Sequence, residues 1–279
     1  MSDTQIDGAP KADAGVKAAP ASETRDFLVF LAKLALFMFI LRSFIIAPFS
    51  IPSESMQPRL LVGDYLIVGK WSYGYSRHSL PYSIPLIPGQ ILPHLPERGD
   101  VVVFKAPPSD RQDYIKRVIG LPGDRIQMRS GQLFLNGRAI PKMRVPDMVV
   151  PVSPNTHCIA PEFERTDPAG QLSCHYPRYR EVLPNGRSYY VLDLAQSVAD
   201  TTEVYTVPQG HVFMMGDNRD NSLDSRFPAE IGAGIGFVPV QNLVGRALFS
   251  VFSTDGSAHW LLPWTWFTAA RWTRIGETF

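Results

Sequence analysis

The sequence predicts a mainly β protein, in which a single N-terminal transmembrane helix precedes an antiparallel β domain with an inserted β-rich subdomain. Three observations predict this fold class. One apolar run near the N-terminus has the length of about 20 residues that crosses a bilayer core. Many short β-branched and aromatic runs follow, each bounded by Gly, Pro or Asp, as in strands separated by turns. A polar, proline-rich stretch interrupts these runs and predicts the insertion.

Composition and charge narrow the classes of function. The chain has 279 residues, of which 45% are hydrophobic and 19% are charged. These values are typical of a folded chain with a core. The net charge is only +1, so the sequence predicts no nucleic-acid partner.

The N-terminal region divides into a tail and an anchor. Residues 1–26 have no periodicity and predict a disordered tail. Residues 27–47 form the apolar run, which contains Lys33 and Arg42. These two residues are nine positions apart, so a helix places them on opposite faces, whereas a helix lying on a membrane surface carries its charges on one side. The run also exceeds the usual core of a cleaved signal peptide. We therefore expect an uncleaved spanning anchor.

The remaining chain is expected to form one interrupted β domain. Residues 48–124 and 209–279 hold most of the short apolar runs and predict the β core. Residues 125–208 are polar and rich in proline, and they predict the inserted subdomain.

The only two cysteines, Cys158 and Cys174, lie in the insertion. Outside the cytoplasm they could form a disulfide that closes a loop of about 15 residues, and two unpaired thiols are the alternative. Each cysteine has a histidine neighbour, His157 or His175. The spacings typical of zinc sites are missing, so no metal site is predicted.

Two serines follow the anchor in the segment IPSESM. In an extended segment, side chains two positions apart point the same way, so Ser53 and Ser55 share a face and Glu54 points elsewhere. The two hydroxyls could be a nucleophile and a hydrogen-bond donor for acyl transfer. Ordinary turn serines after Pro52 are the alternative reading.

A nucleophilic serine needs a base, and Lys116 in the segment DYIKRVIG is one candidate. Tyr114 and Val118 share its face of the expected strand, and such a setting removes water from the amine. Desolvation lowers a lysine pKa from about 10.4 by up to several units. An exposed lysine is the alternative, and His211 is a second candidate base for Ser55.

The third polar stretch is GDNRDNSLDSR, residues 216–226, which follows an apolar run. It lacks the ligand pattern of a calcium loop. An ionic network of Asp224 and Arg226 could hold this loop and present Ser222 to a neighbouring polar group.

The C-terminal stretch, residues 259–279, holds four of the five tryptophans, with Arg271 and Arg274 nearby. Tryptophan at this density beside arginine suits a surface that enters the lipid interface. An ordinary aromatic edge of the core is the alternative, and the sequence leaves both open.

Taken in order, these stretches resemble the bacterial type I signal peptidases, membrane-anchored serine proteases with a Ser/Lys dyad. The resemblance covers residues 27–250 approximately. The matching stretches are IPSESMQPRLLVGDYLIVGK, DVVVFK, YIKRVIGLPGD, MMGDNRDNSLDSR and VPVQNLVGRA.

The resemblance implies a role for each matching residue. Ser55 is the implied nucleophile and Lys116 the implied general base. The Ser53 hydroxyl and the Ser55 N–H would form the oxyanion hole, and Ser222 would hydrogen-bond the lysine and orient it. The residues expected to support the site are Tyr114, Ser222, Asp224 and Arg226. The residues expected to bind substrate are Phe49, Ile51, Pro52, Asp113 and Ile115. Many relatives carry Gly where this chain has Glu54.

The implied activity is removal of signal peptides from exported preproteins after an Ala-x-Ala sequence, with no metal or organic cofactor. The implied partners are signal peptides, the lipid bilayer and the vicinity of the export translocon. The implied location is the bacterial cytoplasmic membrane, with the N-terminus inside and the catalytic domain on the periplasmic face. The alternatives are a maturation peptidase dedicated to one pilin or conjugation protein, a non-catalytic membrane-tethered adaptor, and a Ser55–His211 protease.

Overall fold

The computed structural model describes residues 21–259 and 261–279. The predicted tail falls mostly on residues 1–20, which lie outside the described residues. The chain divides after Ile40 into two compact units, an N-terminal helical unit and residues 41–279.

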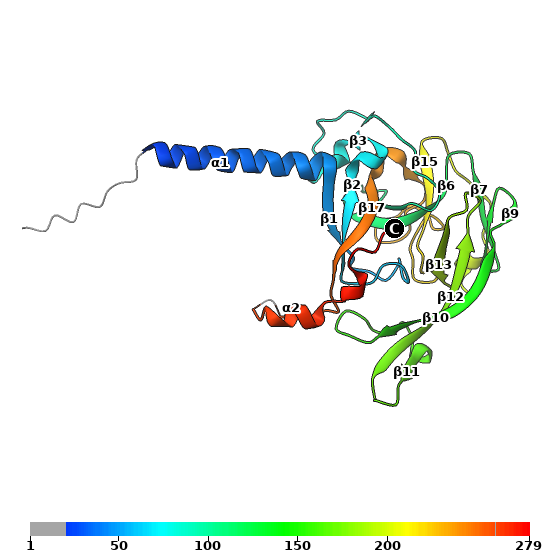
Figure 1. Ribbon diagram of the computed structural model, residues 1–279. Coiled ribbons are helices and arrows are strands. Elements are labelled where there is room, and N and C mark those ends of the chain that lie inside the picture. The colour runs from blue at the N-terminus through cyan, green and yellow to red at the C-terminus, as the bar shows by residue number, and fades with distance from the viewer. Residues whose placement is uncertain (1–20, 260) are drawn as a thin grey trace, which may run out of the picture. The chain divides into compact units, whose positions relative to one another are not determined.

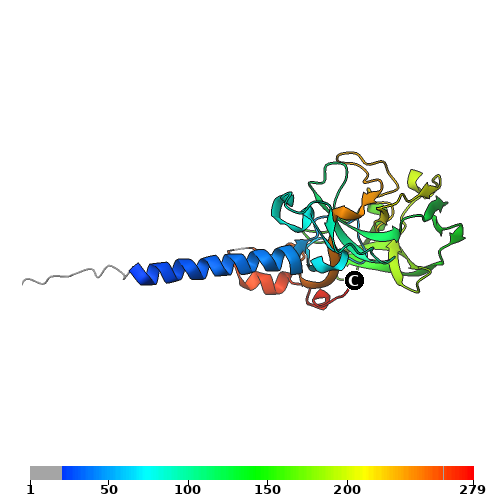
Figure 2. The ribbon, with the colours of Figure 1, turned by 90° about the horizontal axis from the view of Figure 1, so that it is seen from above.

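The helix α1 runs from Ala21 to Ile40, and a π-helical turn, η1 (Leu41–Ile45), follows it (Figure 2). Residues Glu23–Ile45 are long and apolar enough to cross a membrane. The helix begins six residues before Phe27, the predicted start of the anchor, so residues 21–26 are helical and not part of a disordered tail. The helical segment ends three residues before Pro48, a residue type whose ring and missing N–H do not allow a helix to continue.

Residues 41–279 are built on antiparallel sheets (Figure 1). Within the described residues, the main sheet has seven strands in the order β1-β2-β17-β5-β6-β15-β16. Their bounds are β1 (Ile46–Ser50), β2 (Asp64–Gly69), β5 (Val101–Lys105), β6 (Asp113–Gly120), β15 (His211–Met215), β16 (Val238–Pro239) and β17 (Leu243–Ser253). A small hairpin pairs β3 (Tyr75–Ser76) with β4 (Gln90–Ile91).

The polar middle of the chain forms two further sheets. One holds β10 (Lys142–Pro151), β11 (Glu164–Thr166), β12 (Leu172–Val182) and β13 (Ser188–Leu192). The other holds β7 (Arg125–Arg129), β8 (Gln132–Leu135), β9 (Arg138–Ala139) and β14 (Tyr205–Thr206). Apolar side chains from β7, β8 and β13 pack in one cluster with Ile119 of β6 and Phe213 of β15. The inserted strands therefore share a core with the main sheet. Cys158 and Cys174 form a disulfide, and Cys174 lies near the start of β12.

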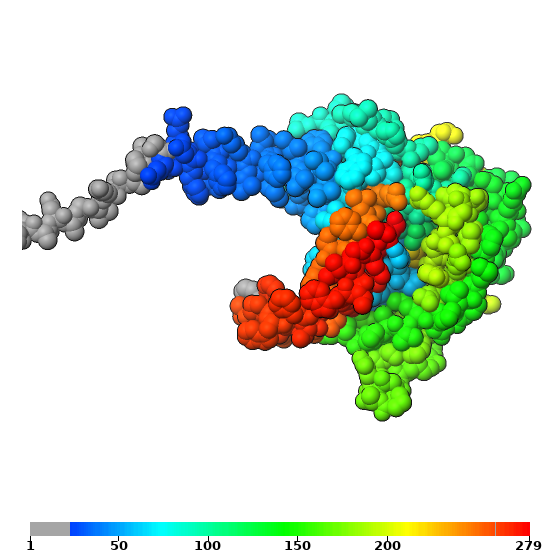
Figure 3. Space-filling view, in the orientation of Figure 1, coloured from blue at the N-terminus to red at the C-terminus, as the bar shows by residue number. Residues whose placement is uncertain are grey.

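The C-terminal segment lies along β17, as the red and orange surfaces in Figure 3 show. Isolated bridges join Phe249 to Thr278 and Thr254 to Ala270. The short helix α2 (Trp264–Ala269) ends directly before Ala270. Three tryptophans of this segment are exposed, namely Trp264, Trp266 and Trp272. Their side chains therefore do not form an aromatic edge of the core.

Candidate active site

The segment after β1 carries the two predicted serines into a turn. Ile51 is buried and its N–H donates to the carbonyl of Asp64, which extends the pairing of β1 past its last residue. Met56 and Leu60 are fully buried beyond the turn and fix it against the core. Ser55 is 8% exposed. Its Oγ lies 3.4 Å from the Oγ of Ser53, so the two hydroxyls do share a face.

Lys116, in β6, contacts Ser55 in the turn that follows β1. Its Nζ donates a hydrogen bond of 2.7 Å to the Ser55 Oγ, and the Tyr114 ring centroid lies 5.6 Å from the same nitrogen. Lys116 is 4% exposed. Burial lowers its pKa from 10.5 to about 8, against the opposing effect of Asp224 and Asp217. A usable fraction of the amine is therefore neutral near pH 7 and able to accept a proton.

The environment of β6 differs from the expected pattern of one inward and one outward face. Ile115 and Arg117 are buried as well as Lys116, because both faces of the strand are covered: Ile115 packs in a cluster with Ile51, and Arg117 lies over the ring of Tyr189 in β13. Arg117 donates to both carboxylate oxygens of Asp217, at 2.7 and 2.6 Å. This ion pair ties β6 to the loop at residues 216–226.

The same loop is held by a second ion pair, between Asp224 and Arg226, which are both buried. Asp224 also accepts from the Gly216 N–H at 3.0 Å, and Arg226 donates to the carbonyl of Arg219 at 2.6 Å. Burial raises the pKa of Asp224, but the charge of Arg226 and the hydrogen bonds to the carboxylate outweigh it and leave this pKa below its usual value. The carboxylate therefore stays charged beside Lys116.

Ser222 lies in the cleft beside the dyad, but the expected hydrogen bond to Lys116 is not formed. The Ser222 Oγ is buried and has no hydrogen-bond partner among the described residues. It packs instead beside Gly216, where a Cβ would lie 2.2 Å from that oxygen. The serine is thus next to the site without orienting the lysine in this structure.

Two residues that hold the nucleophile were not singled out from the sequence. The N–H of Asn218 donates to the carbonyl of Ser55 at 3.1 Å. At Gly216 a Cβ would lie 2.6 Å from the same carbonyl oxygen, so only glycine lets the loop approach so closely. The signal available in the sequence was a glycine between an apolar strand and a polar loop, a common mark of close backbone approach.

Glu54 points away from the serine pair, as expected, and reaches the polar loop. Its Oε2 accepts from the Nδ2 of Asn221 at 3.1 Å. Burial raises the pKa of this carboxyl, against the opposing effects of His157 and Asn221. Glu54 therefore links the nucleophile turn to the loop.

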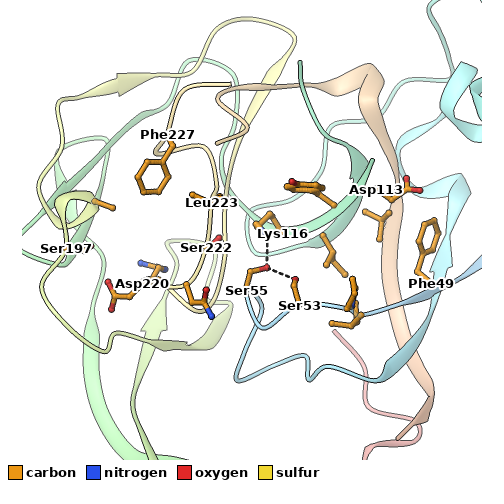
Figure 4. A pocket seen from close by; sticks show the side chains of 18 of the residues that line it. Phe49, Ser53, Ser55, Asp113, Lys116, Ser197, Asp220, Ser222, Leu223 and Phe227 are labelled. Carbon is orange, nitrogen blue, oxygen red and sulfur yellow. Dashed lines mark hydrogen bonds between the residues drawn. The ribbon is translucent and has the colours of Figure 1, made fainter. Parts of the chain in front are cut away.

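The dyad lies in the middle of a cleft of about 540 Å³ (Figure 4). Phe49 and Asp113 lie on one side of Lys116 and Ser55, and Leu223, Phe227 and Asp220 lie on the other. The cleft brings together all the residues expected to bind substrate, which are Phe49, Ile51, Pro52, Asp113 and Ile115. Ile51 and Ile115 also pack in one apolar cluster.

His211 takes no part in this cleft. It is in β15, and its Nδ1 lies 3.0 Å from the carbonyl oxygen of Gln209. The partner of the Ser55 hydroxyl is Lys116.

One group of carboxylates has the spacing of metal ligands. Asp193, Asp200 and Asp220 lie close together. Lys142 pairs with Asp193, and backbone N–H groups of Leu194 and Ser197 donate to Asp220 and Asp200. These contacts already use one oxygen of each carboxylate.

Comparison with known proteins places the chain among the signal peptidases. The family described as signal peptidase, peptidase S26, matches residues 24–252. A signal peptidase I from Rickettsia typhi is 37% identical over 224 residues, covering 77% of this chain and 75% of that protein. A signal peptidase I from Rickettsia canadensis is 38% identical over 227 residues, with coverages of 77% and 75%. The crystal structure of a signal peptidase I from Enterococcus faecalis is 23% identical, with a TM-score of 0.28, and covers 55% of this chain and 97% of that one. The chain belongs to the signal peptidase family, peptidase S26.

Proposed function

We propose that this protein is a membrane-bound serine endopeptidase that removes N-terminal signal peptides from exported preproteins after small residues. The observation that carries the proposal is the 2.7 Å hydrogen bond between the buried Lys116 amine and the Ser55 hydroxyl. A serine needs a base within hydrogen-bond reach to act as a nucleophile. Membership of the signal peptidase family supports the choice of substrate.

Acylation starts with neutral Lys116. Its Nζ takes the proton of Ser55 as the Oγ attacks the carbonyl carbon of the scissile bond, and a C–O bond forms. The oxyanion is stabilised by the Ser53 hydroxyl and the Ser55 N–H, since donors aimed at the developing charge lower the barrier. The C–N bond then breaks, and Lys116 passes its proton to the leaving amine.

Deacylation repeats these roles with water. Lys116, neutral again, takes a proton from a water molecule that attacks the acyl carbon. The C–O bond to Ser55 breaks, and the proton on Lys116 returns to the serine oxygen. Asp224 and Asp217 favour the protonated amine, while burial disfavours it, so the amine can take up and release a proton near neutral pH.

Substrate recognition follows from the walls of the cleft. An extended segment between the end of β1 and the start of β6 would gain backbone hydrogen bonds, as in strand addition. Ile51 and Ile115 offer apolar walls in that part of the cleft. In this proposal, small apolar side chains before the cut pack against these two walls.

We further propose a single-pass arrangement in the bacterial cytoplasmic membrane, with the N-terminus inside and the catalytic unit outside. The disulfide Cys158–Cys174 supports an oxidising compartment for this unit. The exposed Trp264, Trp266 and Trp272 suit contact with the lipid interface. Since exported chains emerge at the translocon, the enzyme would work in its vicinity.

The test is cleavage of a preprotein with an Ala-x-Ala site by the detergent-solubilised full chain. We expect the wild type and His211→Ala to cut after the last small residue. Ser55→Ala and Lys116→Ala should lose at least about 10³-fold in kcat/KM, because the members of such a catalytic unit depend on one another. A wild type that binds the preprotein without cutting it would support an adaptor. Loss of activity in His211→Ala with retention in Lys116→Ala would support the histidine as base.

A further inference from the structure

A second, smaller cavity lies where the spanning segment enters the β unit. Its volume is about 130 Å³, and its walls include Arg42 of η1, Pro48 of β1, Lys70 after β2 and Lys105 of β5. Asp113 is the one carboxylate among its lining residues. Three cations therefore face one anion, and the cavity carries a net positive charge of two when its histidine, His78, is neutral. Burial, followed by the charge of Arg77, lowers the pKa of His78, which favours its neutral form.

Lys70 is the most unusual of these cations. It is 6% exposed, and its Nζ donates to the carbonyl of Ser79 at 2.7 Å. Among the described residues no carboxylate lies within ion-pair distance of Lys70 or of Arg42. Asp113, the carboxylate of the cavity, pairs with Lys105 at 3.0 Å. Burial lowers the pKa of Lys70 to about 8, against the effect of Asp113, and Arg42 and Lys105 lower it further. A buried cation without a counter-ion is costly, so the site would gain from a bound anion.

The position of the cavity in the chain indicates which anion is available to bind there. The segment able to cross a membrane ends at Ile45, and β1 begins at Ile46. No linker separates them, so Arg42 lies in the last turn of the spanning segment. The cavity must therefore lie at the membrane surface, at the depth of the lipid headgroups.

The chemistry of the walls suits a phosphate group. Arginine and lysine are the side chains that bind phosphate oxygens by charge-assisted hydrogen bonds. Basic pockets beside a membrane-spanning helix bind the headgroups of anionic lipids. The cavity is about tenfold larger than the roughly 10–15 Å³ that one water needs, so a phosphate with part of its headgroup fits. Its polar lining does not suit an acyl chain.

We propose that this cavity binds the phosphodiester group of an anionic phospholipid from the leaflet at which the β unit emerges. Arg42 and Lys70 are the two cations left to balance the phosphate charge, and Lys105 shares its charge with Asp113. The site does not depend on the proposed proteolysis. It is joined to the catalytic cleft, however, because Phe49 and Asp113 line both cavities. A bound headgroup would fix the edge of the cleft formed by β1 and β6.

The experiment measures lipid retention by the detergent-solubilised full chain, using native mass spectrometry with equal amounts of phosphatidylglycerol and phosphatidylcholine. We expect the wild type to retain phosphatidylglycerol about tenfold over phosphatidylcholine. Arg42→Gln and Lys70→Met should each reduce this preference at least about threefold. Arg138→Gln is the matched control, because Arg138 is exposed on β9 and away from the cavity, and it should keep the wild-type preference.

Several results would overturn the assignment. Equal retention of the two lipids by the wild type would do so, as would an unchanged preference in Arg42→Gln, whose exposed side chain can be replaced without disturbing the core. Addition of inorganic phosphate separates the two sources of the anion. If millimolar phosphate displaces the lipid completely and is itself retained, the site belongs to the soluble ion. If the lipid stays bound, the headgroup is the ligand.

Discussion

At the scale of single residues, the chemistry depends on one buried amine. Lys116 is surrounded by side chains that remove water from it, and two carboxylates, Asp224 and Asp217, partly offset that loss. The balance places its pKa at about 8, in the range where a general base is most effective. An exposed lysine at the same distance from Ser55 would be almost fully protonated at pH 7.

This balance predicts the pH dependence of the reaction. The base must be neutral, so kcat/KM should rise about tenfold per pH unit below the Lys116 pKa and level off above about pH 8. Asp224→Asn removes a charge that raises this pKa, so its profile should shift to lower pH if the variant folds. The profile is measured with a short peptide whose own groups do not titrate between pH 5 and 10. A flat profile across this range would contradict the lysine as the base.

Gly216 allows a second prediction at this scale. A Cβ at this position would lie 2.6 Å from the Ser55 carbonyl oxygen and 2.2 Å from the Ser222 Oγ. Gly216→Ala must therefore displace the nucleophile or the loop. A shift of about 1 Å in a reacting group can cost about 10²-fold in rate, and we expect a loss of that size in kcat. The thermal midpoint of the variant shows whether the fold survives, and activity near the wild-type level would contradict the close approach.

At the scale of elements, the site is formed where one strand and one loop pack together. The strand β6 carries Lys116, and the loop at residues 216–226 supports the turn that carries Ser55. The buried pair of Arg117 and Asp217 joins the two elements. Its net contribution to stability is small when both partners are present, because desolvation offsets their attraction.

Breaking this pair should be costly because one charge is left buried without its partner. Asp217→Leu and Arg117→Met should each lower the free energy of unfolding by about 3–5 kcal/mol, whereas the double variant Arg117→Met/Asp217→Leu should recover much of it. Denaturant titration of the three variants measures the coupling as a double-mutant cycle. Additive losses would show that the pair does not act as a unit.

At the scale of the whole molecule, one segment is suited to anchor the chain in a membrane. Within the described residues a single helical segment, Glu23–Ile45, meets the requirements for crossing a membrane. No linker separates this segment from β1, which begins at Ile46.

The proposed orientation can be checked in intact cells. The exposed Ser257 in the C-terminal region is replaced by cysteine, and a second variant carries Ser2→Cys in the N-terminal tail. A membrane-impermeant maleimide added to intact cells should label Ser257→Cys and not Ser2→Cys, because only the β unit faces outward. Both variants should react after the membrane is permeabilised. Labelling of Ser2→Cys alone in intact cells would mean the reverse orientation.

Features that depend on local pattern could be predicted from the sequence alone. The spanning segment follows from a run of apolar side chains, and the β class follows from short β-branched runs between turn residues. The order of the stretches around Ser55, Lys116 and Asp224 was enough to indicate the family. The local pattern did not give the start of the helix, which begins at Ala21 and not at Phe27.

The tertiary structure decided what depends on contacts between distant parts of the chain. Lys116 and Ser55 are 61 residues apart, and only the packing of the turn after β1 and of the loop at residues 216–226 against β6 brings them within 2.7 Å. Burial of Arg117 required the cover that Tyr189 of β13 and Asp217 supply over that face of β6. Ser222 proved to line the same cleft as the lysine without bonding it. The unpaired charge of Lys70 is likewise invisible in sequence, where its neighbours are aromatic and small. Periodicity reports which face a side chain takes, whereas partners, burial and charge balance arise only when elements pack together.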